Sequence, residues 1–301
     1  MQVFITGASG HIGSAVVPEL LGAGHTVVGL ARSDASAAAL GAACAEVRRG
    51  DLDDLDGLQE AATAADGVIH LAFKHEAMRS GDFPSAISAD RRALEVIGEA
   101  LVGTDKPLVS TSGTMLLAFA DLGRTATEAD VLESGLRVDA ENAVIGLAQR
   151  GVRSSIVRLP PTVHSSLDHH GFVPALIAMA REHGVAGYVG DGANRWPAGH
   201  TLDAARLYRL ALESAPAGTR LHAVADEGVP FRQIAEAIGR HLDLPVASIS
   251  PEDAAAHFDY LGAFAGSDNP ASSALTRQVL GWEPSHPGLL DDLDDGHYFR
   301  G

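Results

Sequence analysis

The chain has 301 residues, of which 46% are apolar and 20% charged, and its formal net charge is −17. This acidic balance excludes nucleic acids and anionic membranes as expected partners, because both bind basic surfaces. No run approaches the ~18 apolar residues of a membrane helix, the start has no signal-type region, and Cys44 is the sole cysteine. We therefore expect a cytoplasmic globular protein without an intrachain disulfide.

The start of the chain predicts a strand, a glycine turn and a helix. Residues 2–6 are β-like and apolar, residues 11–22 are helix-like, and Gly7, Gly10 and Gly13 lie between and within them. Gly7 permits a tight turn, Gly10 lets a pyrophosphate approach the backbone, and Gly13 lets the helix pack on the strand. The context predicts a dinucleotide site, and an ordinary turn without a ligand is the alternative.

Strands and helices alternate through the first half of the chain. We predict strands at 2–6, 26–31, 45–48, 67–72, 107–111 and 153–159, and helices at 11–22, 36–42, 53–64, 84–102 and 138–150. This alternation predicts an α/β fold with a Rossmann-type doubly wound parallel sheet. Later helices are expected at 172–183, 202–214, 230–241 and 251–258, separated by short strands and turns. We therefore expect an NADP-binding domain over 1–164 and a smaller α+β substrate lobe over 165–301, with the chain free to cross back.

The end of the second strand indicates which dinucleotide is bound. An acidic residue there would bind the ribose 2′-hydroxyl of NAD, but the chain has Ala31 followed by Arg32 and Ser33. A guanidinium can bind a 2′-phosphate through two hydrogen bonds, and the serine adds a donor. The sequence favours NADP(H), although Asp34 could reach the ribose in a different turn.

Residues 6–13, Thr-Gly-Ala-Ser-Gly-His-Ile-Gly, resemble the cofactor fingerprint of the extended or atypical short-chain dehydrogenases/reductases. This family includes nucleotide-sugar epimerases, dehydratases and carbonyl reductases. Further matching segments follow in family order at 50–52, 68–72, 108–113, 157–163 and 280–284. With Arg32 and Ser33, the resemblance implies a cofactor-binding set of Gly7, Ser9, Gly10, His11, Ile12, Gly13, Asp51, Leu52, Leu71, Ala72, Phe73, Pro160 and Val163.

The catalytic Tyr-x-x-x-Lys pair of that family is absent. The only lysines are Lys74 and Lys106, and the four tyrosines all lie in the second half of the chain, at 188, 208, 260 and 298. Counting back from the Ala-Glu at 140–141 places Glu133 at the tyrosine position and Arg137 at the lysine position. The usual asparagine of the preceding helix is also missing, so the standard proton relay is gone.

Four residues are candidates for its replacement. Ser112 matches the substrate-binding serine of the family and could donate a hydrogen bond to a carbonyl, or it is an ordinary strand-end hydroxyl. Arg137 could hold the ribose, but a guanidinium cannot donate a proton at neutral pH. Glu133 could act as an acid only if burial raised its pKa. His164 follows the segment that resembles the nicotinamide-facing loop, so we predict it, or a relayed water, as the proton donor.

Two other features have simpler interpretations. Asp168, His169 and His170 are residue types that can bind a metal ion. Adjacent side chains seldom converge on one ion, so no metal site is expected. Trp196 lies in a predicted turn between Arg195 and Pro197, which makes it the first candidate for a residue of an apolar substrate pocket, with core packing as the alternative.

The sequence thus predicts an NADP(H)-dependent oxidoreductase that reduces a small ketone or aldehyde, or oxidises the matching alcohol. One alternative is a non-catalytic NADP(H)-binding redox sensor of the NmrA-like type, which the missing tyrosine and lysine would suit. The other is a nucleotide-sugar epimerase or dehydratase. The resemblance also implies a homodimer formed through the helices at 84–102 and 138–150.

Overall fold

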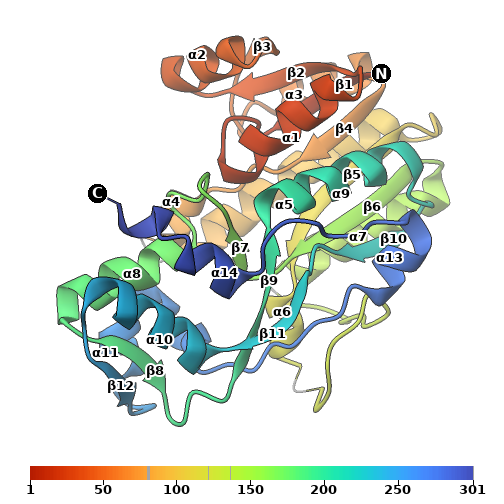
Figure 1. Cartoon of the computed structure of the whole chain (residues 1–301). Coiled ribbons are helices and arrows are strands. Elements are labelled where there is room, and N and C mark those ends of the chain that lie inside the picture. Colours follow the sequence, from red (N-terminus) through yellow and green to blue (C-terminus); the bar gives the residue numbers. More distant parts are fainter. Residues whose placement is uncertain (80–81, 121, 136, 301) are drawn as a thin grey trace.

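A computed structural model describes residues 1–79, 82–120, 122–135 and 137–300 of the protein (Figure 1). Within these residues, seven strands pair in parallel into one sheet of order β10-β6-β5-β4-β1-β2-β3. They are β1 (Gln2–Thr6), β2 (Thr26–Ala31), β3 (Glu46–Arg49), β4 (Gly67–His70), β5 (Pro107–Gly113), β6 (Arg153–Leu159) and β10 (Thr219–His222). The predicted Rossmann-type parallel sheet is confirmed.

Helices cover both faces of this sheet. One face packs against α1 (His11–Gly22) and α9 (Thr201–Ser214). The other face packs against α3 (Leu55–Ala64), α5 (Phe83–Leu101) and α7 (Val138–Gly146), while α2 (Asp34–Ala42) lies beside β2 and β3. The chain crosses back, because α9 and β10 come from the second half of the sequence and complete the large sheet and its covering layer.

Local sequence explains where these helices begin and which side they bury. Side chains of Ser33, Asp54 and Asp82 accept hydrogen bonds from first-turn amides of α2, α3 and α5, as N-cap residues do. Helix α5 buries residues three and four apart, which follows from its helical period. The helix predicted over 138–150 becomes the 3-10 helix η1 (Leu147–Arg150) at its end, where Gly151 has a φ of 74°.

The second lobe contains two small sheets, β11-β9-β7 and β12-β8. Its strands are β7 (Thr162–His164), β8 (Ala186–Val189), β9 (Arg195–His200), β11 (Asp226–Pro230) and β12 (Val246–Ile249). Its helices are α8 (Phe172–His183), α10 (Phe231–Leu242), α11 (Ala254–Phe258), η2 (Asp259–Leu261), α12 (Gly262–Ala265), α14 (Leu289–Asp294) and η3 (His297–Phe299). Helix α13 (Ala274–Leu280) instead packs against β10 and α9 of the large sheet. Figure 1 shows α8, α10 and α11 at the lower left. Two short helices follow strands of the large sheet, α4 (His75–Arg79) after β4 and α6 (Met115–Ala118) after β5.

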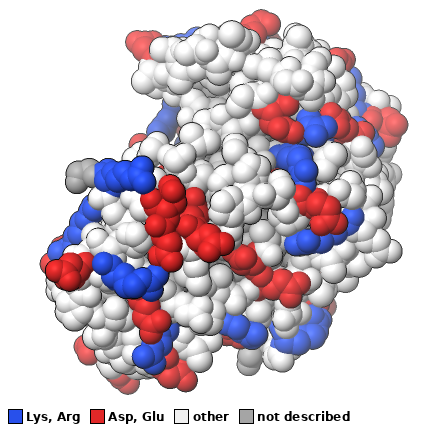
Figure 2. Space-filling model, in the orientation of Figure 1, with Lys and Arg blue, Asp and Glu red and all other residues white. Residues whose placement is uncertain are grey.

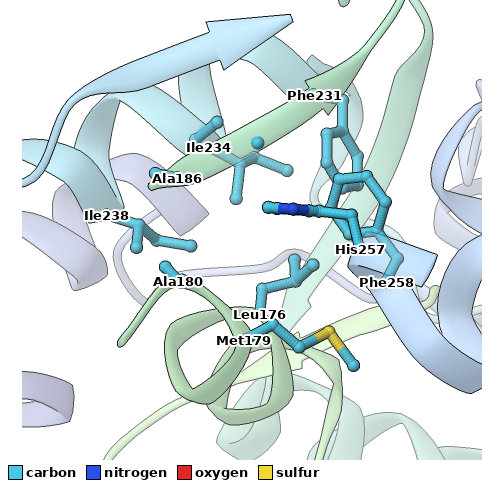
Figure 3. A pocket seen from close by; sticks show the side chains of 11 residues that line it. Leu176, Met179, Ala180, Ala186, Phe231, Ile234, Ile238, His257 and Phe258 are labelled. Atoms are coloured by element: carbon cyan, nitrogen blue, oxygen red, sulfur yellow. The ribbon is translucent and has the colours of Figure 1, made fainter. Parts of the chain in front are cut away.

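The prediction that Trp196 lies in a turn and lines a pocket is wrong. Trp196 belongs to β9, is fully buried, and packs its ring against Phe172 and Phe231. The nearby cavity between α8, α10, α11 and β8 encloses only about 10 Å³ and is lined by core side chains around His257 (Figure 3). That is room for about one water molecule, so these aromatic residues form the core of the lobe.

The surface carries the expected acidic character. Figure 2 shows acidic side chains spread over the face that carries α14, where Asp291, Asp294 and Asp295 are exposed. In the described part of the chain, no helix has both the length and the apolar composition needed to cross a bilayer.

Candidate functional site

The glycine turn brings β1, α1 and the end of β4 into close contact. Gly7 has a φ of +71°, and a Cβ there would lie 2.7 Å from the Ala72 nitrogen. A Cβ on Gly13 would lie 2.3 Å from the Gly7 carbonyl oxygen. Gly10 occupies the N-cap position of α1 and supplies no side-chain cap, so the first-turn amides remain open to an anion. This turn fits the pyrophosphate of a dinucleotide.

Two arginines lie at the edge of the sheet where the ribose phosphate of the cofactor was predicted. Arg32 forms an exposed ion pair with Glu76 of α4, with 3.1 Å between Nη2 and Oε1. Ser33 caps α2 and accepts a hydrogen bond from the Ser36 amide. Arg49, at the end of β3, donates to the Ser33 carbonyl at 2.6 Å and forms an ion pair with Asp34.

The remaining predicted cofactor residues follow the carboxyl ends of the strands. Asp51 accepts the Asp53 amide at 2.8 Å and Leu52 is buried. Leu71 and Ala72 donate their amides to the backbone oxygen and the hydroxyl of Thr6, so both also belong to the packing of β4 on β1. The turn residues Ser9, His11 and Ile12 open α1, whereas Pro160 and Val163 lie at and near β7 and are buried.

A row of buried polar side chains, which the sequence analysis did not identify, holds the side chain of Arg137 in place. Thr6 Oγ1 lies 2.9 Å from His70 Nδ1, and His70 Nε2 lies 3.1 Å from Asp90 Oδ1. The second oxygen of Asp90 lies 3.5 Å from the Arg137 guanidinium. Burial would raise the pKa of Asp90, but the hydrogen bond from His70 and the charge of Arg137 hold it below its ordinary value. An acidic residue within the apolar stripe of α5 was the signal available in the sequence.

Arg137 therefore has a fixed position at the end of β5. It donates to the Thr111 carbonyl at 3.1 Å, and its guanidinium carbon lies 4.3 Å from the centre of the Phe73 ring. On the opposite side of β5, Tyr208 is fully buried with its hydroxyl 2.7 Å from Thr111 Oγ1, and burial raises its pKa. Tyr208 is thus held inside the molecule. Glu133 is exposed in the segment before α7.

Ser112 lies next to a buried ion cluster. Its hydroxyl is close enough to Glu141 to help lower the pKa of that carboxyl, yet it forms no hydrogen bond of ordinary geometry among the described residues. Burial would raise the pKa of Glu141, but two hydrogen bonds from Arg158 and one from Arg220 lower it. Leaving a buried hydroxyl without a firm partner costs free energy, so a ligand group that reached Ser112 would gain a hydrogen bond.

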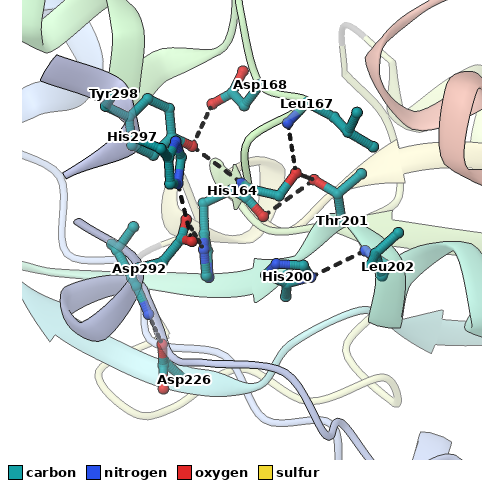
Figure 4. Close-up of polar contacts among 12 residues, drawn as sticks. His164, Leu167, Asp168, His200, Thr201, Leu202, Asp226, Asp292, His297 and Tyr298 are labelled. Carbon is teal, nitrogen blue, oxygen red and sulfur yellow. Dashed lines mark hydrogen bonds and ion pairs between the residues drawn. The ribbon is translucent and has the colours of Figure 1, made fainter. Parts of the chain in front are cut away.

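His164 lies in an enclosed cluster, which argues against the predicted role as proton donor (Figure 4). Its ring is fully buried, and Nδ1 lies 2.9 Å from Asp292 Oδ2 of α14. The other Asp292 oxygen lies 3.0 Å from His297 Nε2, while His164 Nε2 has no partner among the described residues. No hydrogen bond or ion pair in the described part of the chain joins His164 to Ser112 or Arg137.

Asp168 links the start of α1 to the C-terminal segment. His11 Nε2 lies 2.8 Å from Thr201 Oγ1, and Nδ1 lies 3.5 Å from Asp168. Tyr298 donates to Asp168 and accepts the Ser165 amide (Figure 4). Burial, with smaller effects of neighbouring histidines, lowers the pKa of His11 to about 4, and burial raises that of Asp168 to about 6. Among the described residues, no group of three or more potential ligands is arranged to hold a metal.

Comparisons with known proteins agree with this geometry. The sequence profile of the NAD dependent epimerase/dehydratase family matches residues 3–114. The chain is 48% identical to uncharacterized protein C2A9.02 of Schizosaccharomyces pombe over 99% of this chain and 100% of that protein. It is 45% identical to uncharacterized protein YLL056C of Saccharomyces cerevisiae over 97% and 98%.

Two solved structures share the fold. UDP-glucose 4-epimerase of Thermotoga maritima with UDP-glucose superposes with a TM-score of 0.79 at 17% identity, covering 99% of this chain and 98% of that chain. DesIV, a dTDP-glucose 4,6-dehydratase of Streptomyces venezuelae with NAD bound, has a TM-score of 0.74 at 21% identity, covering 99% and 96%. The profile match identifies the family and the superpositions show the same fold, so the chain belongs to the NAD dependent epimerase/dehydratase family.

Proposed function

We propose that the protein is an NADP(H)-dependent oxidoreductase that reduces a small ketone or aldehyde, or oxidises the matching alcohol. The observation that carries this proposal is the uncapped glycine turn at α1 together with Arg32 directly after β2, where Ala31 replaces the acid that an NAD enzyme of this fold would have. The NAD bound to the structural neighbour DesIV supports a nicotinamide dinucleotide at this turn.

The residues around Arg137 suit a reaction at a carbonyl group. The nicotinamide would supply or accept the hydride. Arg137, fixed by Asp90 and Phe73, would hold the ribose and place positive charge near the carbonyl oxygen. Ser112 would orient that oxygen through its hydroxyl. Because arginine cannot release a proton at neutral pH and His164 is enclosed, water at this edge would supply the proton.

Each of two alternatives has one observation in its favour. The absence of a tyrosine before residue 188, and of a lysine beyond residue 106, supports a redox sensor that binds NADP(H) without turnover. The nucleotide-sugar epimerase and dehydratase among the structural neighbours support chemistry of that kind. In the second lobe, Arg195 is paired with Asp268 at 2.7 Å, so a sugar nucleotide would have to replace that carboxylate to use this cation.

Calorimetric binding of NADPH and NADH tests the cofactor assignment. Arg32→Ala should weaken NADPH binding by about tenfold to a hundredfold, the effect of losing a charged hydrogen bond, and should leave NADH binding nearly unchanged. Arg91→Ala is the matched control, because Arg91 is an exposed, ion-paired arginine of α5. Equal losses for both cofactors in Arg32→Ala would refute the 2′-phosphate assignment.

We also propose a homodimer formed through α5 and α7. The outer face of α5 exposes Arg91, Arg92, Glu95 and Glu99, so such an interface would be polar at this helix. Light scattering coupled to size exclusion should give twice the chain mass of 31.1 kDa, and a monomer at micromolar concentration would contradict the proposal.

A further inference from the structure

Arg49 lies beside the strand position that distinguishes NAD from NADP. Strands β2 and β3 are parallel neighbours, and their register places Arg49 opposite Ala31. Ala31 occupies the position where a carboxylate would bind the ribose 2′-hydroxyl. The register of β3, rather than spacing along the sequence, brings this second guanidinium to the turn that follows β2.

The contacts of Arg49 hold its guanidinium over that turn. Nη1 donates to the Ser33 carbonyl at 2.6 Å, and Nη2 forms an ion pair with Asp34. The Asp34 side chain is 98% exposed and that of Arg49 is 52% exposed. An exposed ion pair of this kind contributes little to stability, so a doubly charged phosphate can replace the carboxylate at small cost.

The same contacts also bear on whether Asp34 could bind the ribose 2′-hydroxyl of NAD. While it is paired with Arg49, Asp34 is held away from acting as a free acceptor for a ribose hydroxyl. Arg32 is likewise paired with an exposed carboxylate, that of Glu76. The turn thus carries two guanidiniums and two carboxylates that can turn out into solvent. In a chain of net charge −17, binding a phosphate requires such local cations.

We propose that Arg49 is a specificity-determining residue that binds the 2′-phosphate of NADP(H) together with Arg32, exchanging Asp34 for the phosphate. This inference rests on the proposed NADP(H) function and assigns a second cation to that site. Arg32 and Arg49 then approach the phosphate from two adjacent strands, as guanidiniums suit phosphate recognition.

Arg48 provides a matched control within the same strand. Its side chain points to the opposite face of the sheet, because successive residues of a strand alternate, and it pairs with Glu60 of α3 at 2.9 Å. Replacing Arg48 or Arg49 by alanine therefore removes the same charge and one ion pair from neighbouring positions, but only Arg49 lies at the turn after β2.

The test measures NADPH and NADH dissociation constants by calorimetry for the full chain and three variants. Arg49→Ala should weaken NADPH binding about tenfold or more and change NADH binding less than threefold, while Arg48→Ala should change neither. Asp34→Asn should tighten NADPH binding severalfold, because it removes the competing carboxylate. A misfolded variant could not produce that gain.

The outcomes separate this inference from the proposed function. If the unmodified chain prefers NADPH but Arg49→Ala behaves like Arg48→Ala, the role of Arg49 is refuted and the cofactor assignment stands. If the unmodified chain prefers NADH, both are refuted. Equal weakening of NADPH and NADH by Arg49→Ala, or no gain from Asp34→Asn, would also overturn the role of Arg49.

Discussion

Single residues decide how closely the cofactor turn packs. Gly13 faces the Gly7 carbonyl at a distance that leaves no room for a Cβ, whereas a Cβ on Gly22, at the end of the same helix, would meet no atom within 4 Å. Position 13 of α1 therefore requires glycine, whereas position 22 has room for a larger side chain.

A pair of alanine substitutions tests this difference. Gly13→Ala should destabilise the protein by about 1–3 kcal/mol and abolish measurable NADPH binding, because β1 and α1 must move apart. Gly22→Ala should be neutral or slightly stabilising, since alanine favours helices. Urea denaturation and calorimetry measure the two effects, and normal NADPH binding by Gly13→Ala would contradict the description of the turn.

The protonation of His200 should make the stability of the protein depend on pH. It lies at the N-cap of α9, where its Nδ1 accepts the Leu202 amide at 3.2 Å, and its ring stacks on His286. Burial, and then the neighbouring His164 and His286, lower its pKa to about 4, although Asp292 and Asp203 oppose this shift. Protonation would also remove the acceptor that caps the helix.

The sign of the pH effect follows from the lowered pKa. Between about pH 6.5 and 4 the unfolded chain binds the proton more strongly at His200, so stability is full above 6.5 and falls as the pH decreases. His200→Asn keeps a good N-cap without titrating. When the pH is lowered from 7 to 5, the free energy of unfolding measured in urea should fall by about 1 kcal/mol less for the His200→Asn variant than for the unmodified chain, after allowance for solvent screening. If the stability of the variant and of the unmodified chain changed equally with pH, His200 would not be the titrating group.

Elements from distant parts of the sequence are joined by the buried Glu141 cluster. Glu141 of α7 binds Arg158 of β6 and Arg220 of β10. These three elements form the β10 side of the large sheet, where the second half of the chain returns to the first. The cluster therefore fixes the placement of β10 beside β6.

Neutralising this carboxylate should weaken the sheet. Glu141→Gln leaves the buried guanidinium of Arg158 and the partly buried one of Arg220 without this counter-charge, and we expect a loss of about 3–5 kcal/mol in unfolding free energy. Glu99→Gln is the control, because its ion pair with Arg150 is exposed and should leave stability unchanged. Similar urea midpoints for Glu141→Gln and the unmodified chain would show that the cluster contributes little.

Much of the fold was predictable, because apolar runs, glycine turns and helical periods are local signals. The strands at 2–6, 26–31 and 153–159 were predicted to the residue. The return of α9 and β10 to the large sheet was not, since nothing local encodes strand order. In the candidate site, the glycine turn and Arg32 were visible. Asp90 and Arg49 were missed because their positions depend on helix packing and β3 register.

The whole molecule combines a large sheet whose glycine turn fits a dinucleotide with a smaller lobe whose core between α8, α10, α11 and β8 leaves a cavity of only about 10 Å³. His11 of α1 contacts Asp168 and Thr201, and the C-terminal segment holds that region through Asp292 with His164 and Tyr298 with Asp168. In the proposed reductase, the substrate would meet the cofactor at the carboxyl edge of the large sheet, near Arg137.

Turnover of NADPH on a panel of small ketones and aldehydes, followed by the absorbance of the reduced nicotinamide, tests the proposed reductase most sharply. We expect oxidation of NADPH by at least one carbonyl compound, with an equal amount of alcohol formed and at least roughly tenfold lower kcat/KM in Arg137→Ala. Tight NADPH binding without turnover on any member of the panel would contradict the reductase and support a sensor.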